Sequence, residues 1–240
     1  MSEFTLRPET MDGWIFDEIH TRNVYRLADS FSPRDVVIDI GAHIGIFTLA
    51  ALNRGCRRVH SVEADAENHR VAARNLQTYF EEGLVSLTRA AVWRSDENDD
   101  VLRFSGYSAV GRLINTGAGN VIWSEDGPLV PKMSFDELVR VAATEGDGRV
   151  RLVKFDCEGS EWPILFTSET LHLVEEICGE FHDIGGARDG RRFPFSVCGR
   201  DTFTAPQLTP LLESKGFQVK FNYFSSRSRA GMFFAKRRAT

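Results

Sequence analysis

Short runs of aliphatic residues recur along the chain, and polar or glycine-containing turns separate them. The first strong run covers residues 36–40, where every residue except Asp39 is valine or isoleucine, a pattern typical of a strand buried on both faces. The run ends at Gly41, and after Gly45 residues 46–52 have the length and apolar spacing of a helix. A buried strand, a glycine turn and a helix predict the opening unit of a doubly wound α/β sheet.

The alternation of strands and helices continues through the rest of the chain. Helices are expected to start near Asp65, Ser134 and Pro206, because each of these residues is favoured at a helix start. Strands are expected at residues 58–62, 84–92, 150–155 and 173–181, and an antiparallel hairpin at 217–224 and 231–236. This order predicts an α/β fold with about five parallel strands, crossover helices and a closing hairpin.

Three segments lie outside this regular pattern. Residues 1–35 carry apolar residues at helical spacing, so we predict an N-terminal helical cap there and one domain over residues 36–240. The cap either covers the sheet or acts as a flap over a ligand. Residues 106–127 are rich in glycine and predict a long loop with an extra hairpin. Residues 184–204 hold several arginines and phenylalanines, and we interpret this segment as a substrate lid whose arginines meet an anionic substrate.

Composition places the chain among ordinary globular proteins, with 42% hydrophobic and 26% charged residues. A formal net charge of −5 argues against nucleic acid as a partner. No apolar run is long enough to span a bilayer, and the N-terminus lacks the apolar stretch of a secretory signal, so we expect a cytoplasmic protein without a membrane partner. The four cysteines are scattered without a C-x-x-C pair, which predicts reduced, mostly buried thiols.

The glycine turn after the first strand departs from the dinucleotide fingerprint. A pyrophosphate site has the pattern G-x-G-x-x-G, whereas this chain has Asp39-x-Gly41-x-x-x-Gly45, with His43 in place of the second glycine. An acid before the first glycine repels phosphate but suits a cationic amino acid. S-adenosylmethionine carries an ammonium and a sulfonium and no phosphate, so the loop favours that cofactor over NAD.

Glu63 closes the second expected strand, about twenty positions beyond Asp39. An acid at this place in a nucleoside site accepts hydrogen bonds from the ribose hydroxyls. Both candidate cofactors contain an adenosine, so Glu63 supports a nucleoside site without choosing between them. Small residues around Ala91, near the end of the third expected strand, would leave room for a flat adenine ring.

A second group of chemically active residues follows the strand at residues 150–155. Lys154, Asp156, Glu158 and Glu161 stand close together in the sequence, and the carboxyl ends of strands are where open α/β sheets bind ligands. So many carboxylates repel one another unless a cation, a proton or a ligand ammonium lies among them. Lys154 either takes part in the chemistry or pairs with an acid.

The next strand ends in Glu180-Phe181-His182. His182 is the best candidate for a general base because its ordinary pKa lies nearest to neutral pH, with Glu158 or Glu180 orienting it or the acceptor. A hydrogen-bonded structural histidine is the alternative. No metal site is predicted, although a divalent ion held by Asp156 and Glu180 is a further alternative.

These motifs together resemble those of the FkbM-type methyltransferases. Residues 37–45 are similar to the family pattern D-x-G-A-N-x-G, and residues 153–161 are similar to K-x-D-x-E-G-x-E. Residues 180–182 resemble the E-x-H that follows the next strand in the family. The resemblance departs at His43, where the family has asparagine.

The resemblance implies a class I methyltransferase with a Rossmann-like, mostly parallel seven-stranded sheet. It implies S-adenosylmethionine as methyl donor and an O-methyl product on a sugar or a specialised metabolite. The methionine portion of the donor would be held by Asp39, Gly41, His43 and Gly45. Glu63 would hold the ribose, Ala91 would lie beside the adenine, and Asp156 would lie near the methyl-bearing sulfur.

On this interpretation the protein is an O-methyltransferase whose partner is a small molecule with a hydroxyl group. Its candidate catalytic residues are His182, Glu158, Asp156, Glu180 and Lys154. Two other functions stay open: an NAD-linked oxidoreductase, which needs the missing glycine fingerprint, and a non-catalytic module that binds the cofactor. The sequence does not name the acceptor and leaves the oligomeric state open, with a homodimer as one option.

Overall fold

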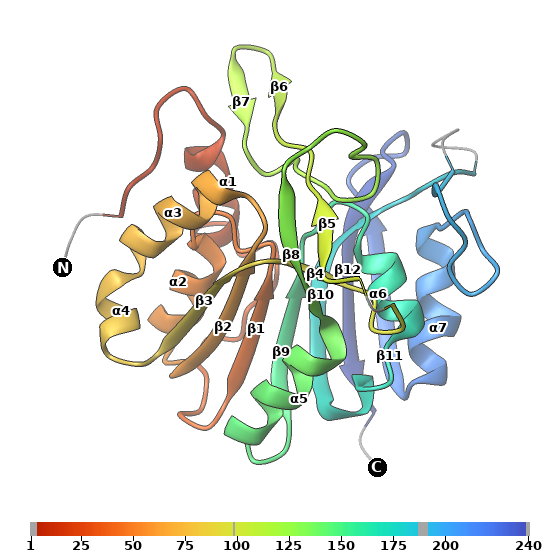
Figure 1. The fold of residues 1–240 in the computed structure, drawn as a ribbon. Helices are drawn as coiled ribbons and strands as arrows, with labels where there is room; N and C mark the ends of the chain where they lie inside the picture. The colour runs from red at the N-terminus through yellow and green to blue at the C-terminus, as the bar shows by residue number, and fades with distance from the viewer. Residues whose placement is uncertain (1–3, 98, 187–191, 239–240) are drawn as a thin grey trace.

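The computed structural model describes residues 4–97, 99–186 and 192–238, and its centre is a single large sheet (Figure 1). Five strands run parallel, namely β1 (Val36–Ile40), β2 (Arg58–Glu63), β3 (Val85–Arg89), β9 (Val150–Phe155) and β10 (Val174–His182). At one edge, β12 (Ala230–Arg237) pairs antiparallel with β10 and with β11 (Phe217–Tyr223). The seven strands follow the order β11-β12-β10-β9-β1-β2-β3. The predicted mostly parallel seven-stranded sheet with a closing hairpin is confirmed.

Helices cover both faces of this sheet (Figure 1). One face is covered by α1 (Asp12–His20), α2 (Ile46–Asn53), α3 (Ala66–Asn75) and α4 (Gln77–Glu81). The other face is covered by α5 (Phe135–Glu145), α6 (Glu161–Thr167) and α7 (Leu208–Ser214), with short 3₁₀ turns at Leu171–Leu173 and Ala205–Gln207. This is the three-layer arrangement of a doubly wound α/β domain.

Alternate residues of β1 enter two different hydrophobic cores. Ile38 and Ile40 pack in the core that includes α5 and α6, whereas Val37 packs in the core that includes α2. Asp39 points to the same face as Val37, because side chains alternate along a strand. It is fully buried there, and the hydroxyl of Thr48 in α2 donates to its carboxylate at 2.7 Å.

The chain segments that leave β1 and β9 come into close contact. Gly41 has a φ of +75°, and a Cβ added to it would lie 1.8 Å from the carbonyl oxygen of Asp156. A side chain at this position would therefore be excluded both by the backbone conformation and by the neighbouring strand end. The glycine brings the loop after β1 directly against Asp156.

The predicted third strand over residues 84–92 divides into two strands. After β3 the chain enters β4 (Ala91–Trp93), which joins a second sheet with β8 (Leu129–Ser134) and β5 (Val101–Arg103). Trp93 is buried and packs edge-on against Phe195 at a centroid distance of 5.9 Å. An apolar run does not reveal where the chain changes its strand partner, because both halves carry apolar residues.

The segment predicted as a substrate lid packs largely into the core. Phe193 and Phe203 are 4% and 0% exposed. Phe203 stacks on the indole of Trp162 in α6, with ring centroids 5.6 Å apart. The lid prediction is wrong for these phenylalanines, because burying their apolar area stabilises the core instead. Arg192 makes an ion pair on the surface, while Arg188 and Arg191 lie outside the described residues.

Several smaller predictions can be compared with the fold. Within the described part of residues 1–35 there is one helix, α1, which packs against α2, and the division into cap and domain stays a prediction. The extra hairpin in residues 106–127 is present as β6 (Ser108–Val110) and β7 (Leu113–Asn115). The four cysteines are free, with Cys56 and Cys178 buried and Cys198 exposed. None of the described helices is long and apolar enough to cross a membrane.

Candidate active site

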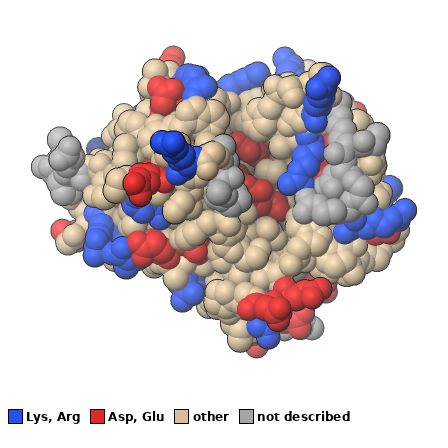
Figure 2. Space-filling view, turned by 90° about the horizontal axis from the view of Figure 1, so that it is seen from above, with Lys and Arg blue, Asp and Glu red and all other residues tan. Residues whose placement is uncertain are grey.

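A cavity of about 560 Å³ opens at the carboxyl ends of β1, β2, β9 and β10, beside α1 and the segment 115–121. Among the described residues its lining includes Lys154 and the carboxylates of Glu18, Glu63, Asp156, Glu158 and Glu180. Figure 2 looks down on this face and shows acidic side chains inside the hollow. The fold thus brings together the strand ends at which the sequence placed its chemically active residues.

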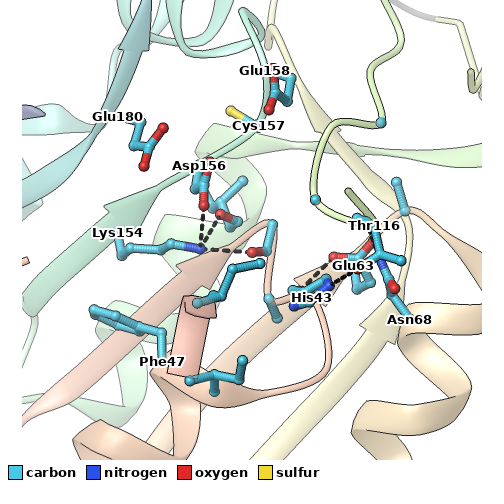
Figure 3. A pocket seen from close by; sticks show the side chains of 18 of the residues that line it. His43, Phe47, Glu63, Asn68, Thr116, Lys154, Asp156, Cys157, Glu158 and Glu180 are labelled. Atoms are coloured by element: carbon cyan, nitrogen blue, oxygen red, sulfur yellow. Dashed lines mark hydrogen bonds and ion pairs between the residues drawn. The ribbon is translucent and has the colours of Figure 1, made fainter. Parts of the chain in front are cut away.

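Lys154 lies buried among these strand ends (Figure 3). Its Nζ is 3.1 Å from Oδ1 of Asp39 and 3.8 Å from Oδ2 of Asp156, and it donates to the carbonyl oxygen of Gly41 at 2.7 Å. Burial alone would lower the pKa of Lys154, but the two carboxylates outweigh it and the net shift is upward. The amine therefore stays charged. This agrees with one of the two sequence-based alternatives for Lys154, namely that it pairs with an acid.

The loop after β1 reaches the cavity through Gly41 and His43, whereas Asp39 and Gly45 lie behind the wall. Asp39 is fully buried, and its charge is balanced by Lys154. Gly45 has a φ of +89°, and a Cβ there would lie 2.8 Å from the side chain of Leu76. Both residues therefore shape the loop from behind, and the expected direct contact of Asp39 with a ligand ammonium does not follow from this geometry.

Glu63 ends β2 beside the same loop. The backbone amides of His43 and Asp65 donate to its two carboxylate oxygens at 2.7 and 2.8 Å. The side chain is buried in the cavity wall, and this burial raises the pKa of Glu63 to about 7. Ala91, at the start of β4, also lines the cavity. The residues predicted to lie by the ribose and the adenine therefore face the same space.

His43 connects three separate segments of the chain. Its Nε2 lies 3.1 Å from Nη2 of Arg7 and 2.7 Å from Oγ1 of Thr116, and Arg7 pairs with the buried Asp12 at 2.8 Å. A guanidinium can only donate, so Nε2 accepts, and the neutral ring carries its proton on Nδ1. Burial lowers the pKa of His43 to about 4, in keeping with a neutral ring. His43 thus ties the N-terminal segment and the loop after β7 to the loop after β1.

His182 ends β10 with carboxylates beside both ring nitrogens. Nδ1 lies 3.2 Å from Glu161, and Nε2 lies 3.4 Å from Glu158 and 3.8 Å from Glu180. Burial alone would lower the pKa of His182, but Glu158 and Glu161 outweigh it and raise the pKa well above its usual value. Glu158 and Glu180 line the cavity, and His182 is not among the lining residues. The predicted base is therefore close to its predicted partners, but the carboxylates face the cavity.

The remaining acids crowd this end of the cavity and repel one another when ionised. Burial and the nearby Asp156 raise the pKa of Glu180 to about 8, and burial also raises the pKa of Glu158. Asp156 accepts a hydrogen bond from the hydroxyl of Tyr25 at 3.0 Å. Such surroundings favour a ligand with positive charge. No three His, Cys, Asp or Glu side chains in the described ranges form a group that could hold a metal ion.

Sequence reasoning missed several residues of the cavity wall. Tyr25 has the pattern of an apolar residue in a cap, and Asn68 and Thr116 look like ordinary polar residues of a helix and a loop. The side-chain amide of Asn68 donates to the carbonyl oxygen of Thr116 at 2.8 Å, although 48 positions separate the two. No local sequence pattern signals a contact of this range.

Comparison with solved structures gives matches of low sequence identity. Methyltransferase FkbM from Methylobacillus flagellatus KT matches with a TM-score of 0.48 and 15% identity. That match covers 91% of this chain and 47% of the other, so this chain spans about half of its length. The pyocyanin biosynthetic protein PhzM matches with a TM-score of 0.46 and 14% identity, over 95% of this chain and 56% of the other.

Comparison with curated proteins and family models is more specific. The 31-O-demethyl-FK506 methyltransferase FkbM of Streptomyces tacrolimicus is 29% identical over 203 residues, which are 72% of this chain and 76% of the relative. The model of the methyltransferase FkbM domain matches residues 39–219. Because this match spans well over half of the 240 residues, the chain belongs to the methyltransferase FkbM domain family, and the resemblance seen in its motifs is confirmed.

Proposed function

We propose that this protein is an O-methyltransferase that takes a methyl group from S-adenosylmethionine and transfers it to a hydroxyl of a small molecule. The observation that carries the proposal is the acidic lining of the cavity. Five acidic side chains among the described residues line it, and Lys154 in its wall is already paired with Asp39. A donor with a sulfonium and an ammonium is stabilised in such surroundings, whereas the pyrophosphate of NAD is repelled.

The residues of the cavity fit this donor. Each oxygen of Glu63 binds one backbone amide and keeps a second acceptor site, which can receive a ribose hydroxyl. The small side chain of Ala91 leaves space in the cavity for the flat adenine ring. The volume of about 560 Å³ lies in the usual range of about 300–1,000 Å³ for small-molecule sites.

When bound, S-adenosylmethionine supplies a methyl group already activated by the positive sulfur. The protein then has to align the acceptor oxygen with the carbon–sulfur bond, exclude water and accept the hydroxyl proton. Alignment of this kind can lower a barrier by about 7–11 kcal/mol, and a positioned base adds about 10²–10⁴-fold in rate. Tyr25 and Lys154 hold Asp156 in place at the acidic end, where this alignment would occur.

The curated relative supports oxygen as the accepting atom. It is described as a methyltransferase of 31-O-demethyl-FK506, and that name places the missing methyl group on an oxygen. We propose that this chain also methylates an oxygen atom. We do not propose FK506 as its substrate.

Isothermal titration tests the donor. Wild type and Glu63→Gln are titrated with S-adenosylmethionine and separately with NAD, and Glu67→Gln serves as the matched control because Glu67 pairs with Arg70 on the surface of α3. We expect S-adenosylmethionine to bind, more weakly to Glu63→Gln and unchanged to Glu67→Gln. Binding of NAD instead, or no binding of S-adenosylmethionine, overturns the donor assignment.

A screen of small molecules with methyl-labelled donor tests the acceptor. We expect the label on an oxygen of the product. Transfer to nitrogen or carbon overturns the O-methyl assignment while leaving the donor in place.

A further inference from the structure

The surroundings of His182 determine the protonation state of its ring. Nδ1 lies 3.2 Å from Glu161 and Nε2 lies 3.4 Å from Glu158. A neutral imidazole donates from one nitrogen only, and an ionised carboxylate only accepts. Both contacts are satisfied together when the ring carries a proton on each nitrogen. A ring in this state has no lone pair with which to take a proton from a substrate.

Glu161 holds the His182 ring in place. Its carboxylate is fully buried and accepts from the backbone amides of His182 and Gly159 at 2.7 and 2.8 Å, in addition to its contact with Nδ1. The indole of Trp162 donates to the carbonyl oxygen of His182 at 2.7 Å. The first turn of α6 therefore fixes both the backbone and the ring of His182, and leaves Nε2 for the cavity carboxylates.

Glu158 is the cavity carboxylate that lies nearest to this ring. Its distance of 3.4 Å from Nε2 compares with 3.8 Å for Glu180. Its backbone has a φ of +52°, which is uncommon for a residue other than glycine. Asp156 is already engaged by Tyr25 and Lys154. Among the lining acids, Glu158 thus combines access to the cavity with direct contact to a buried cation.

We propose that Glu158 is the general base of the methyl transfer, and that His182 and Glu161 are positioning residues which keep it ionised and in place. This inference rests on the proposed O-methyl transfer. The acceptor oxygen bonds to the methyl carbon while the carbon–sulfur bond breaks and its electron pair passes to sulfur. The hydroxyl proton moves to Glu158 and then to solvent. These roles reverse the sequence-based hypothesis, in which His182 was the base.

The electrostatics of the two neighbouring acids support this division. Burial raises the pKa of Glu158, but the adjacent imidazolium opposes the shift and favours the ionised form. Burial and Asp156 raise the pKa of Glu180 to about 8, so Glu180 holds its proton at neutral pH. The titratable groups that face the ring from α6, from the turn after β9 and from β10 are Glu161, Glu158 and Glu180. Glu158 can then take a proton from the acceptor, whereas Glu180 already carries one.

The protonation state of His182 can be measured without an acceptor. Protein with labelled histidine rings is followed by NMR from about pH 5 to about pH 9. We expect His182 to be an imidazolium at neutral pH, while His43 is neutral in the same spectra. Glu158→Gln and Glu161→Gln are each expected to lower the His182 midpoint, which also assigns its signals. A neutral His182 with a bare Nε2 at neutral pH overturns the inference.

Kinetics with an acceptor from the labelled-methyl screen separate the base from the positioning residues. Glu158→Gln is expected to lower kcat, measured at saturating donor, by about 10²–10⁴-fold, and Glu158→Asp to keep part of the rate. Glu161→Gln is expected to lower kcat less and to move the acid limb of the pH profile upward, because Glu158 loses its cation. An unchanged kcat in Glu158→Gln overturns the base assignment. Failure of wild type to bind or use S-adenosylmethionine overturns the proposed function instead.

Discussion

The ammonium of Lys154 lies 3.1 Å from the carboxylate of Asp39, and the two residues are register partners on the parallel strands β9 and β1. They are 2% and 0% exposed. A charge buried so deeply is tolerated only with a partner. The acid that opens the first sequence motif and the lysine that opens the second are therefore one structural pair, which holds the two halves of the cavity wall together.

Removing one member of this pair should destabilise the fold. Asp39→Ala leaves the Lys154 ammonium without its nearest carboxylate, and we expect the free energy of unfolding in urea to fall by about 3–5 kcal/mol. The double variant Asp39→Ala/Lys154→Met, which removes both charges, is expected to recover most of that loss. Arg192→Ala breaks an exposed pair and should change the free energy of unfolding by less than about 0.5 kcal/mol. An Asp39→Ala protein as stable as wild type would contradict the assigned role.

His43 should make the fold sensitive to acid. Its pKa is lowered to about 4 in the folded protein, whereas a histidine in the unfolded chain titrates near about 6.5. Between these values the unfolded chain binds a proton that the folded chain does not. The stability that the neutral His43 contributes is therefore fully present above about pH 6.5 and is lost as the pH falls towards about 4. The loss is at most about 1.4 kcal/mol per pH unit.

The variant His43→Asn, which has no titrating ring, isolates this effect. We expect urea denaturation at several pH values to show a shallower loss of stability between about pH 6.5 and about pH 4.5 than in wild type. Acids away from His43 are the same in both proteins and cancel in the comparison. Identical slopes would mean that His43 takes up its proton equally in the folded and the unfolded chain, which contradicts the lowered pKa.

Donor affinity should depend on pH through Glu63. Burial raises the pKa of this residue to about 7, and an ionised carboxylate accepts hydrogen bonds more strongly than a protonated one. We expect the affinity for S-adenosylhomocysteine, measured by titration calorimetry, to rise between about pH 6 and about pH 8. Glu63→Gln should lose this dependence and bind about 10–100-fold more weakly, since hydrogen bonds to a charged group contribute about 1.5–3 kcal/mol. A wild-type affinity that is flat over this range would argue against the ribose contact.

Two phenylalanines distinguish core from cavity. Phe203 is fully buried, and Phe203→Ala should lower the free energy of unfolding by about 3–5 kcal/mol while leaving donor affinity unchanged in the folded protein. Phe224 is 54% exposed and lines the cavity. We expect Phe224→Ala to leave stability nearly unchanged and to raise KM for the acceptor. If Phe203→Ala is stable but impaired in acceptor binding, the lid interpretation would return for that residue.

Local sequence was sufficient for the elements that depend on local burial. A strand such as Val36–Ile40 is a nearly continuous apolar run because parallel strands are covered on both faces. Gly41 and Gly45 mark the turn because few other residues adopt its backbone. The same local reasoning failed at residues 84–92 and for Phe193 and Phe203, because an apolar residue does not reveal which surface will cover it.

The sequence by itself thus determined the α/β fold, the strands of the main sheet, the family resemblance and the acids at the strand ends. Only the tertiary structure decided how those acids divide their roles. It paired Asp39 with Lys154, placed Thr116 against His43 across 73 positions, and surrounded His182 with carboxylates so that Glu158 faces the cavity. The physical reason is that protonation and pairing depend on distances between segments, and these exist only once the sheet and its helices have packed.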